Sequence, residues 1–229
     1  MVDKYNMTVE QNIFLAKRNI IDYIWKSAKL EGLGVTFPET DAIFNGYSPS
    51  NAKVLDIIAV NNLKHAWQFL FDTLDCPADF PLICQINRFV SGDNLIYDSG
   101  YLRKIPMRIG GTTWIPSIPI EVDIKESISK INEIDCATER AIVMMLYCMR
   151  EQMFIDGNKR TSMLFANHIM IHNGCGIISI PVEKQIEFKT LLLNYYETND
   201  MNVIKQFVYD YCVDGMDFKK QYEESHRFN

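Results

Sequence analysis

Residues 149–162 read MREQMFIDGNKRTS and join two segments of helical periodicity. Apolar residues recur at helical spacing through 138–150, and a second helix is expected to begin within 158–162 and to end at about 173. Gly157 lets the backbone turn sharply, and the first amides of the following helix have no partner inside that helix. Such amides, together with the helix dipole, attract anions. The stretch therefore predicts an anion-binding loop between two helices.

The polar residues of this loop have the chemistry of a phosphate site. Lys159 and Arg160 add positive charge, and an arginine can grip a phosphate with two hydrogen bonds. Asp156 is the natural carboxylate for Mg²⁺, which commonly binds through one carboxylate and phosphate oxygens. Asn158 can donate its amide to a phosphate oxygen, and Phe154 is expected to anchor the loop in the core. On these residues alone, an ordinary helix–turn–helix connection explains the stretch equally well.

Two stretches resemble one protein family. QMFIDGNKRT, at 152–161, resembles the signature loop of the Fic/Doc (Fido) family, written HxFx(D/E)GN(G/K)R. Upstream, GYLRKIPMRIGGTTWIP at 100–116 resembles the β-hairpin flap of that family. Together with the flanking helices, the resemblance covers about 80–213. It implies an all-α Fic fold, which is a helical bundle with a small β-hairpin flap.

The resemblance also implies roles for individual residues. In this family a nucleotide, usually AMP from ATP, is transferred to a hydroxyl of a target protein, so ATP and Mg²⁺ are the implied cofactors. By motif position, Asp156 would coordinate Mg²⁺ and Arg160 would hold the distal phosphates. The anion hole would consist of Gly157, Asn158 and Lys159. The flap would align the target protein through six residues: Ile109, Gly110, Gly111, Thr112, Thr113 and Trp114.

The first position of the signature departs from the family, because Gln152 stands where the catalytic histidine is usual. A neutral amide forms hydrogen bonds but cannot take a proton from the attacking hydroxyl. A positioned base contributes about 10²–10⁴-fold to a rate, so transfer is expected to be weak or absent. His168 and His172 lie on the following helix, more than two turns beyond the loop, which is too far for either to act as the missing base. Their spacing fits a solvated or core-satisfied pair better than a zinc site.

Two further departures concern the phosphates. Lys159 stands where nucleotide-transferring members usually have glycine, and a lysine there resembles the Doc branch, whose members transfer phosphate. Met163 occupies the position of the second arginine in the longer motif ending RxxR. Its loss is expected to weaken the grip on a triphosphate.

A second element near the N-terminus resembles the inhibitory motif (S/T)xxxE(G/N) of Fic proteins. SAKLEG, at 27–32, places Ser27 and Glu31 four residues apart on one helical face. In the family this glutamate enters the nucleotide site and pairs with the second arginine. Met163 removes that partner here, which leaves Arg160 or Lys159. The alternative is a solvated glutamate before a glycine helix end.

Several functions stay open at this stage. One is a pseudoenzyme that binds ATP and Mg²⁺ but transfers poorly; another is an active transferase that moves AMP or phosphate to a protein hydroxyl. Removal of a modification by water positioned at Glu31 has less support, because that chemistry usually also needs the missing histidine. A purely structural loop is the fourth.

Composition sets the remaining expectations. The chain has 229 residues, 48% of them apolar, which suffices for one domain at 48–229 preceded by an N-terminal segment, 1–47, with the inhibitory-type helix. A net charge of −6 predicts no nucleic-acid partner, and no uncharged stretch is long enough for a membrane span. Six cysteines without a CxxC pair favour reduced thiols in a cytoplasmic protein. Whether the chain forms a homo-oligomer stays open.

Helical patterns dominate the rest of the chain, and one segment differs. Residues 100–119, with Gly110-Gly111 as a turn signal, are the expected β-hairpin. Further helices are expected at about 8–32, 48–73, 80–90, 122–134, 183–198 and 202–213.

Overall fold

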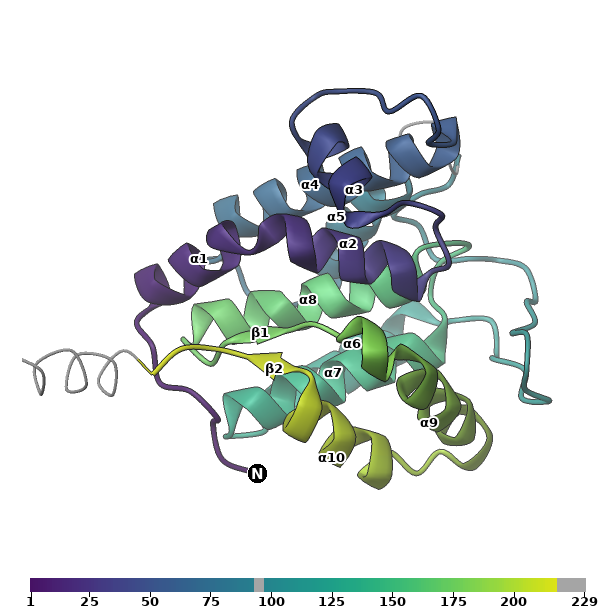
Figure 1. Ribbon diagram of the computed structural model, residues 1–229. Coiled ribbons are helices and arrows are strands. Elements are labelled where there is room, and N and C mark those ends of the chain that lie inside the picture. Colours follow the sequence, from purple (N-terminus) through teal and green to yellow (C-terminus); the bar gives the residue numbers. More distant parts are fainter. Residues whose placement is uncertain (93–96, 218–229) are drawn as a thin grey trace, which may run out of the picture.

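The computed structural model describes residues 1–92 and 97–217, which form a helical bundle built around two central helices (Figure 1). The first, α7, spans Ala137–Glu151 and leads into the loop; the second, α8, spans Asn158–His172 and leaves it. From Arg160 to Ile171 every residue of α8 is buried, as expected of a helix covered on all sides.

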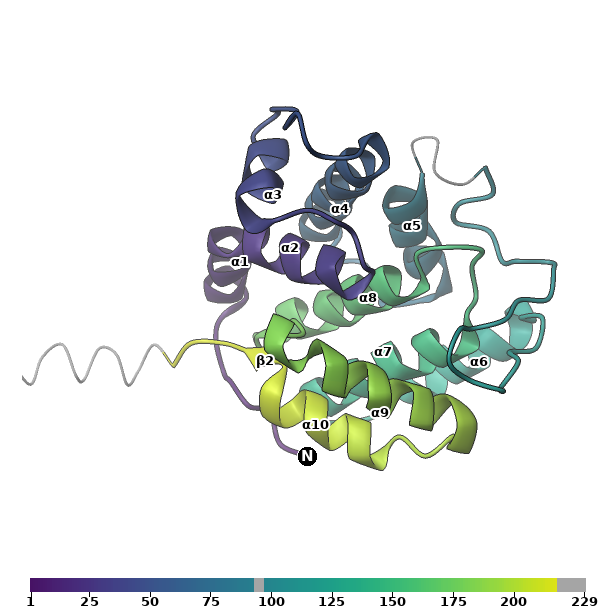
Figure 2. The ribbon, with the colours of Figure 1, turned by 45° about the vertical axis from the view of Figure 1, so that its right-hand side comes forward.

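The other helices surround this pair. Figures 1 and 2 show α1 and α2 beside α8, with α4 and α5 packed behind them and α9 and α10 on the far side, along α7. Their bounds are α1 Val9–Arg18, α2 Ile20–Leu30, α3 Phe37–Phe44, α4 Val54–Asp72, α5 Phe80–Ser91, α6 Glu121–Asn132, α9 Gln185–Thr198 and α10 Asn202–Tyr211. A short 3₁₀ turn, η1, spans Val182–Lys184.

Within the described residues, the only sheet is a two-stranded antiparallel pair. Strand β1 (Ile177–Ile178) follows α8, and strand β2 (Val213–Asp214) follows α10. The buried side chain of Asn167 holds β1 against α8: its oxygen accepts from the amide of Ile178 at 2.7 Å, and its nitrogen donates to the carbonyl of the same residue at 2.9 Å.

The expected fold class is confirmed, but the segment expected to be the hairpin flap takes another form. The described part of 100–119 contains no strand, and the chain instead leaves α5, turns back at Gly110-Gly111 and enters α6. Gly111 has φ +86°, so the turn uses the conformation that favours glycine. We keep the name flap for residues 104–118 of this loop.

Three helix boundaries in the first third differ from the sequence expectation. The helix expected at 8–32 is two helices, because the chain bends at Asn19 (φ −107°). The second expected helix begins at Val54, not at Pro49, and Val54 is exposed. Between them α3 was missed, although its capping box of Thr36 and Glu39 was readable. The capping box at Thr8 is confirmed.

No helix in the described ranges 1–92 and 97–217 is both long enough and apolar enough to cross a bilayer.

Candidate functional site

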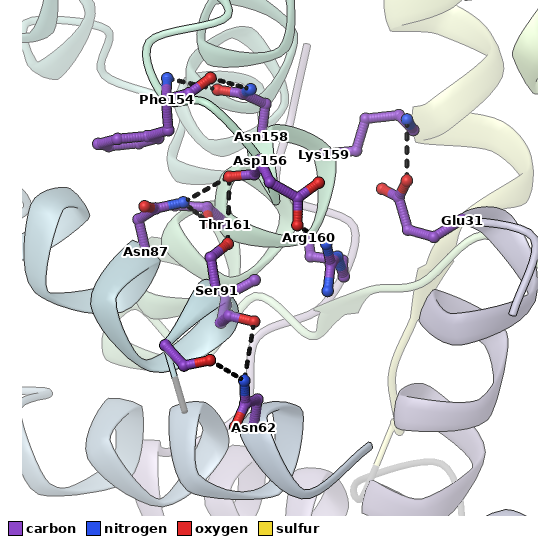
Figure 3. A network of polar contacts seen from close by, with 12 residues as sticks. Glu31, Asn62, Asn87, Ser91, Phe154, Asp156, Asn158, Lys159, Arg160 and Thr161 are labelled. Atoms are coloured by element: carbon purple, nitrogen blue, oxygen red, sulfur yellow. Dashed lines mark hydrogen bonds and ion pairs between the residues drawn. The ribbon is translucent and has the colours of Figure 1, made fainter. Parts of the chain in front are cut away.

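The loop between α7 and α8 is short and is held by its own side chains. It opens at Gln152, which is left-handed with φ +48°, and closes at Gly157, left-handed with φ +75°. Phe154 is buried in the core, as expected. The side chain of Asn158 closes the loop on itself: its oxygen accepts from the amide of Phe154 at 2.9 Å, and its nitrogen donates to the Phe154 carbonyl at 2.8 Å (Figure 3). The side-chain amide of Asn158, which was expected to donate to a phosphate, instead fixes the conformation of the loop.

Helix α5 clamps the loop from outside. The buried amide of Asn87 donates to the carbonyl of Asp156 and to the hydroxyl of Thr161, both at 3.0 Å, and Ser91 donates to the same carbonyl at 3.1 Å (Figure 3). The oxygen of Asn87 accepts from the amide of Gly100 at 2.8 Å, which ties the start of the flap loop to the same residue. Asn87 and Ser91 were not identified as site residues from the sequence. The available signal was their spacing, since they are two polar residues four positions apart in an otherwise apolar helical segment.

Gly157 is required by both its backbone and its surroundings. A Cβ at this position would lie 2.3 Å from the Ser91 hydroxyl and 2.9 Å from a methyl of Val90. The close approach lets α5 press directly on the turn that starts α8.

The start of α8 offers backbone donors. Across the described residues, the amides of 157–160 donate to no protein acceptor, and the side chains provide no cap for this helix. The Asp156 side chain beside them is 46% exposed. Free amides, a helix dipole and an accessible carboxylate thus lie together at the start of α8.

Both cations of the loop are already paired with carboxylates. The Arg160 guanidinium lies 2.7 Å from Asp156, and the Lys159 ammonium lies 3.0 Å from Glu31 at the end of α2 (Figure 3). Neither pair is complete: Arg160 Nε and Glu31 Oε1 are buried and have no hydrogen-bond partner in the part of the chain that the structure describes. Of the two partners expected for Glu31, the structure selects Lys159.

Ser27 and Met163 both line a small cavity beside Arg160. Its volume is about 10 Å³, roughly the room that one water needs, and Asn167 and Ser179 are further polar residues in its lining. Met163, which by sequence aligns with the second arginine of the longer motif, is buried.

Gln152 turns its side chain into the protein and is only 8% exposed. Its amide nitrogen donates to the carbonyl of Met149 at 2.6 Å and lies 3.5 Å from the hydroxyl of Tyr196. The backbone carbonyl of Gln152 accepts a hydrogen bond from Nε of Arg103 at 2.6 Å. The residue therefore closes the end of α7, and its amide is occupied by protein groups.

The tip of the flap is fastened to α9. The carboxylate of Glu197 accepts hydrogen bonds from the Thr112 hydroxyl at 2.6 Å and from the Thr113 amide at 2.5 Å. The Trp114 ring stacks on Tyr196 at 5.9 Å, and the Arg150 guanidinium covers Trp114 at 4.3 Å. The flap side chains thus face α9, and through Tyr196 they reach Gln152. Of the other flap residues, Ile109 packs against the core, and Gly110 and Gly111 form the turn.

The two histidines of α8 lie at its opposite end. His168 bonds the carbonyl of Thr73 at 2.8 Å, and His172 bonds that of Leu74 at 2.9 Å. They hold the chain that follows α4, and burial lowers the pKa of His168.

Comparison with known proteins rests on structure alone, since no protein-family profile and no curated protein matches the chain. Fic-1 from C. elegans (residues 134–508) superposes with a TM-score of 0.74 at 21% identity, over 84% of this chain and 61% of that one. A Fic-domain signaling protein of Bacteroides thetaiotaomicron VPI-5482 gives 0.73 at 18% identity, over 88% and 84%. A Fic family protein of Desulfovibrio desulfuricans G20 gives 0.67 at 16%, over 87% and 64%. The chain therefore has the Fic fold, and it spans about three fifths of the C. elegans chain.

Proposed function

We propose that this chain is a Fic-type domain that binds ATP or a related nucleotide with Mg²⁺ at the start of α8. Its transfer of AMP from the bound nucleotide to a protein hydroxyl would be weak or absent. One observation carries the proposal: the amides of 157–160 have no acceptor among residues 1–92 and 97–217, and they lie beside a half-exposed carboxylate and Lys159. The likeness to Fic-domain structures supports it, because these amides lie at the signature loop.

The residues present fit the proposed ligands. Oδ2 of Asp156 meets Arg160, whereas Oδ1 meets no group within the described chain, and carboxylate oxygens are the ligands that Mg²⁺ prefers. When bound, Mg²⁺ would offset the negative charge of the phosphates. Lys159 would exchange Glu31 for a phosphate oxygen, and the amides would hold a second one.

Poor transfer follows from the position of Gln152. Its amide cannot accept a proton from a hydroxyl, and its nitrogen is engaged by the Met149 carbonyl. The left-handed backbone at Gln152 is one that histidine tolerates better than most residues. A histidine can therefore replace it without a new backbone conformation.

Two measurements test the proposal. Calorimetry with ATP and Mg²⁺ should show binding by the wild type and tighter binding by Glu31→Gly; no heat from either protein refutes it. With α-labelled ATP, Gln152→His should raise the labelling of protein by about 10²-fold or more, because a positioned base contributes that much. Wild-type labelling equal to that of Gln152→His would refute the claim of poor transfer.

A second candidate is active phosphotransfer to a protein hydroxyl. Lys159 favours it, since phosphoryl transfer through a loose transition state depends mainly on positioning and charge and less on a base. Parallel incubations with α- and γ-labelled ATP distinguish the two. Incorporation of the γ label alone would establish phosphotransfer, and incorporation of neither would exclude it.

A further inference from the structure

Arg103 is a buried cation at the base of the flap, outside both motifs. Its side chain is among the largest fully buried ones, with 2% of the residue exposed. All three of its nitrogens donate to backbone carbonyls: Nε to Gln152 at 2.6 Å, Nη1 to Ile105 at 2.9 Å, and Nη2 to Pro116 at 3.3 Å and Ser117 at 2.5 Å.

These four carbonyls belong to three separate segments. Ile105 lies on the outgoing leg of the flap, Pro116 and Ser117 lie on the returning leg, and Gln152 opens the loop before α8. The backbone amide of Arg103 adds a bond of 2.9 Å to the carbonyl of Met153. One side chain therefore joins both legs of the flap to the first residue of the loop.

The guanidinium replaces a strand ladder. No backbone hydrogen bond joins the two legs in the described residues, so a hairpin cannot set their spacing. A planar fork with five fixed donors suits several carbonyls at set angles, whereas a lysine ammonium has three donors at one point. No carboxylate of the described chain lies within 4.0 Å of Arg103, although Glu151 is near enough to interact with its charge, so all of the side chain's hydrogen bonds go to these carbonyls.

We propose that Arg103 is the positioning residue of the flap: it sets the distance and register of both legs over Gln152, and so decides where a segment aligned by the flap meets the loop. The inference rests on the proposed function only for the use of the flap. The tip is held separately, by Glu197, which provides a matched comparison.

Limited trypsin digestion of the full chain tests this assignment, because the outgoing leg contains the cleavage sites Lys104 and Arg108. In Arg103→Lys, cleavage after these two residues should be about tenfold faster or more, while the hydrogen exchange of the α7 and α8 amides keeps the wild-type rate, because local opening is separate from global unfolding. In Glu197→Gln, which releases only the tip, cleavage after Lys104 should keep the wild-type rate. An unchanged cleavage rate in Arg103→Lys overturns the proposal, and so does faster exchange across α7 and α8.

A second measurement needs no substitution at Arg103. In the wild type, the Nε–H proton of Arg103 should be protected from exchange to the same degree as the backbone amide of Arg103, which bonds the Met153 carbonyl, because both are released by the same opening. A protection factor of Nε–H about tenfold lower than that of the amide would overturn the proposal, even if Arg103→Lys failed to fold.

The affinity for ATP and Mg²⁺ separates positioning from general damage. It should be the same in Arg103→Lys and the wild type, since the amides of 157–160 do not contact Arg103. Loss of affinity together with faster cleavage of the outgoing leg would assign Arg103 to the loop as a whole and overturn a role confined to the flap. If the wild type binds no ATP, the proposed function fails, while the cleavage and Nε–H results still decide the role of Arg103.

Discussion

The ammonium of Lys159 lies 3.0 Å from the carboxylate of Glu31, and this ion pair joins the start of α8 to the end of α2. One oxygen of Glu31 makes the pair, and the other is buried with no hydrogen-bond partner among the described residues. A carboxylate thus holds the cation that a phosphate would use. The N-terminal helices, whose residues precede the loop by more than a hundred positions, are in this way connected to the site.

Removal of the Glu31 charge should strengthen nucleotide binding. In Glu31→Gln, Lys159 is released, so the affinity for ATP and Mg²⁺ should rise about threefold to tenfold, about 1 kcal/mol for a partly exposed ion pair. Calorimetry measures the change. Asp22→Asn is the matched control, because it removes one charge from the same helix and breaks the pair with Lys26 instead. An equal effect of both variants would count against a specific role of Glu31.

Replacement of Gly157 by alanine should destabilise the protein by about 2–4 kcal/mol. The left-handed backbone costs about 1–2 kcal/mol for a residue with a Cβ, and the new methyl group collides with Ser91 and Val90. Gly46→Ala isolates the first effect, since Gly46 has φ +88° and open space around it. Urea unfolding of both variants measures the difference, and equal losses would show that the collision is relieved at no cost.

Asn87→Leu should cost about 2–4 kcal/mol in urea unfolding. The substitution leaves the amide of Gly100 and the hydroxyl of Thr161 without their partner, and each buried unsatisfied group costs about 1–3 kcal/mol. As a control, Asn61→Ala should change stability by less than about 0.5 kcal/mol, because Asn61 bonds only within its own helix. Similar losses of unfolding free energy in the two variants would contradict the stabilising role of Asn87 at the loop.

Stability should fall in mild acid because of His168. Burial lowers the pKa of this histidine, and its bond to the Thr73 carbonyl opposes the shift only in part. The unfolded chain therefore takes up the proton first, near pH 6.5, so the free energy of unfolding decreases as the pH falls below about 6.5 and levels off below the pKa of the folded state. Above about pH 7 the contribution is constant.

His168→Asn should remove this part of the pH dependence, while His65→Asn, at an exposed position, should leave it unchanged. Unfolding in urea at several values between pH 5 and about 7.5 provides the comparison. Parallel curves for the wild type and His168→Asn would contradict the assignment to His168.

Local patterns predicted the parts of the fold that local physics decides. The apolar spacing of α5, α7 and α8 indicated each helix to within a few residues, and the capping box at Thr8 marked the start of α1. The flap was different. Gly110-Gly111 indicated a turn correctly, but the two legs do not pair with each other. Arg103 instead donates to backbone carbonyls of both legs.

At the site, the sequence by itself determined the loop: Gly157 for the turn, an unpaired helix start, and the charged residues around them. It also determined that Gln152 cannot act as a base, since that depends on chemistry within one side chain. Only the tertiary structure decided that Glu31 meets Lys159 and that Arg103 holds the carbonyl of Gln152. These contacts join segments far apart in the chain. Their geometry arises from the packing of α2, the flap and α8, and no local pattern carries that information.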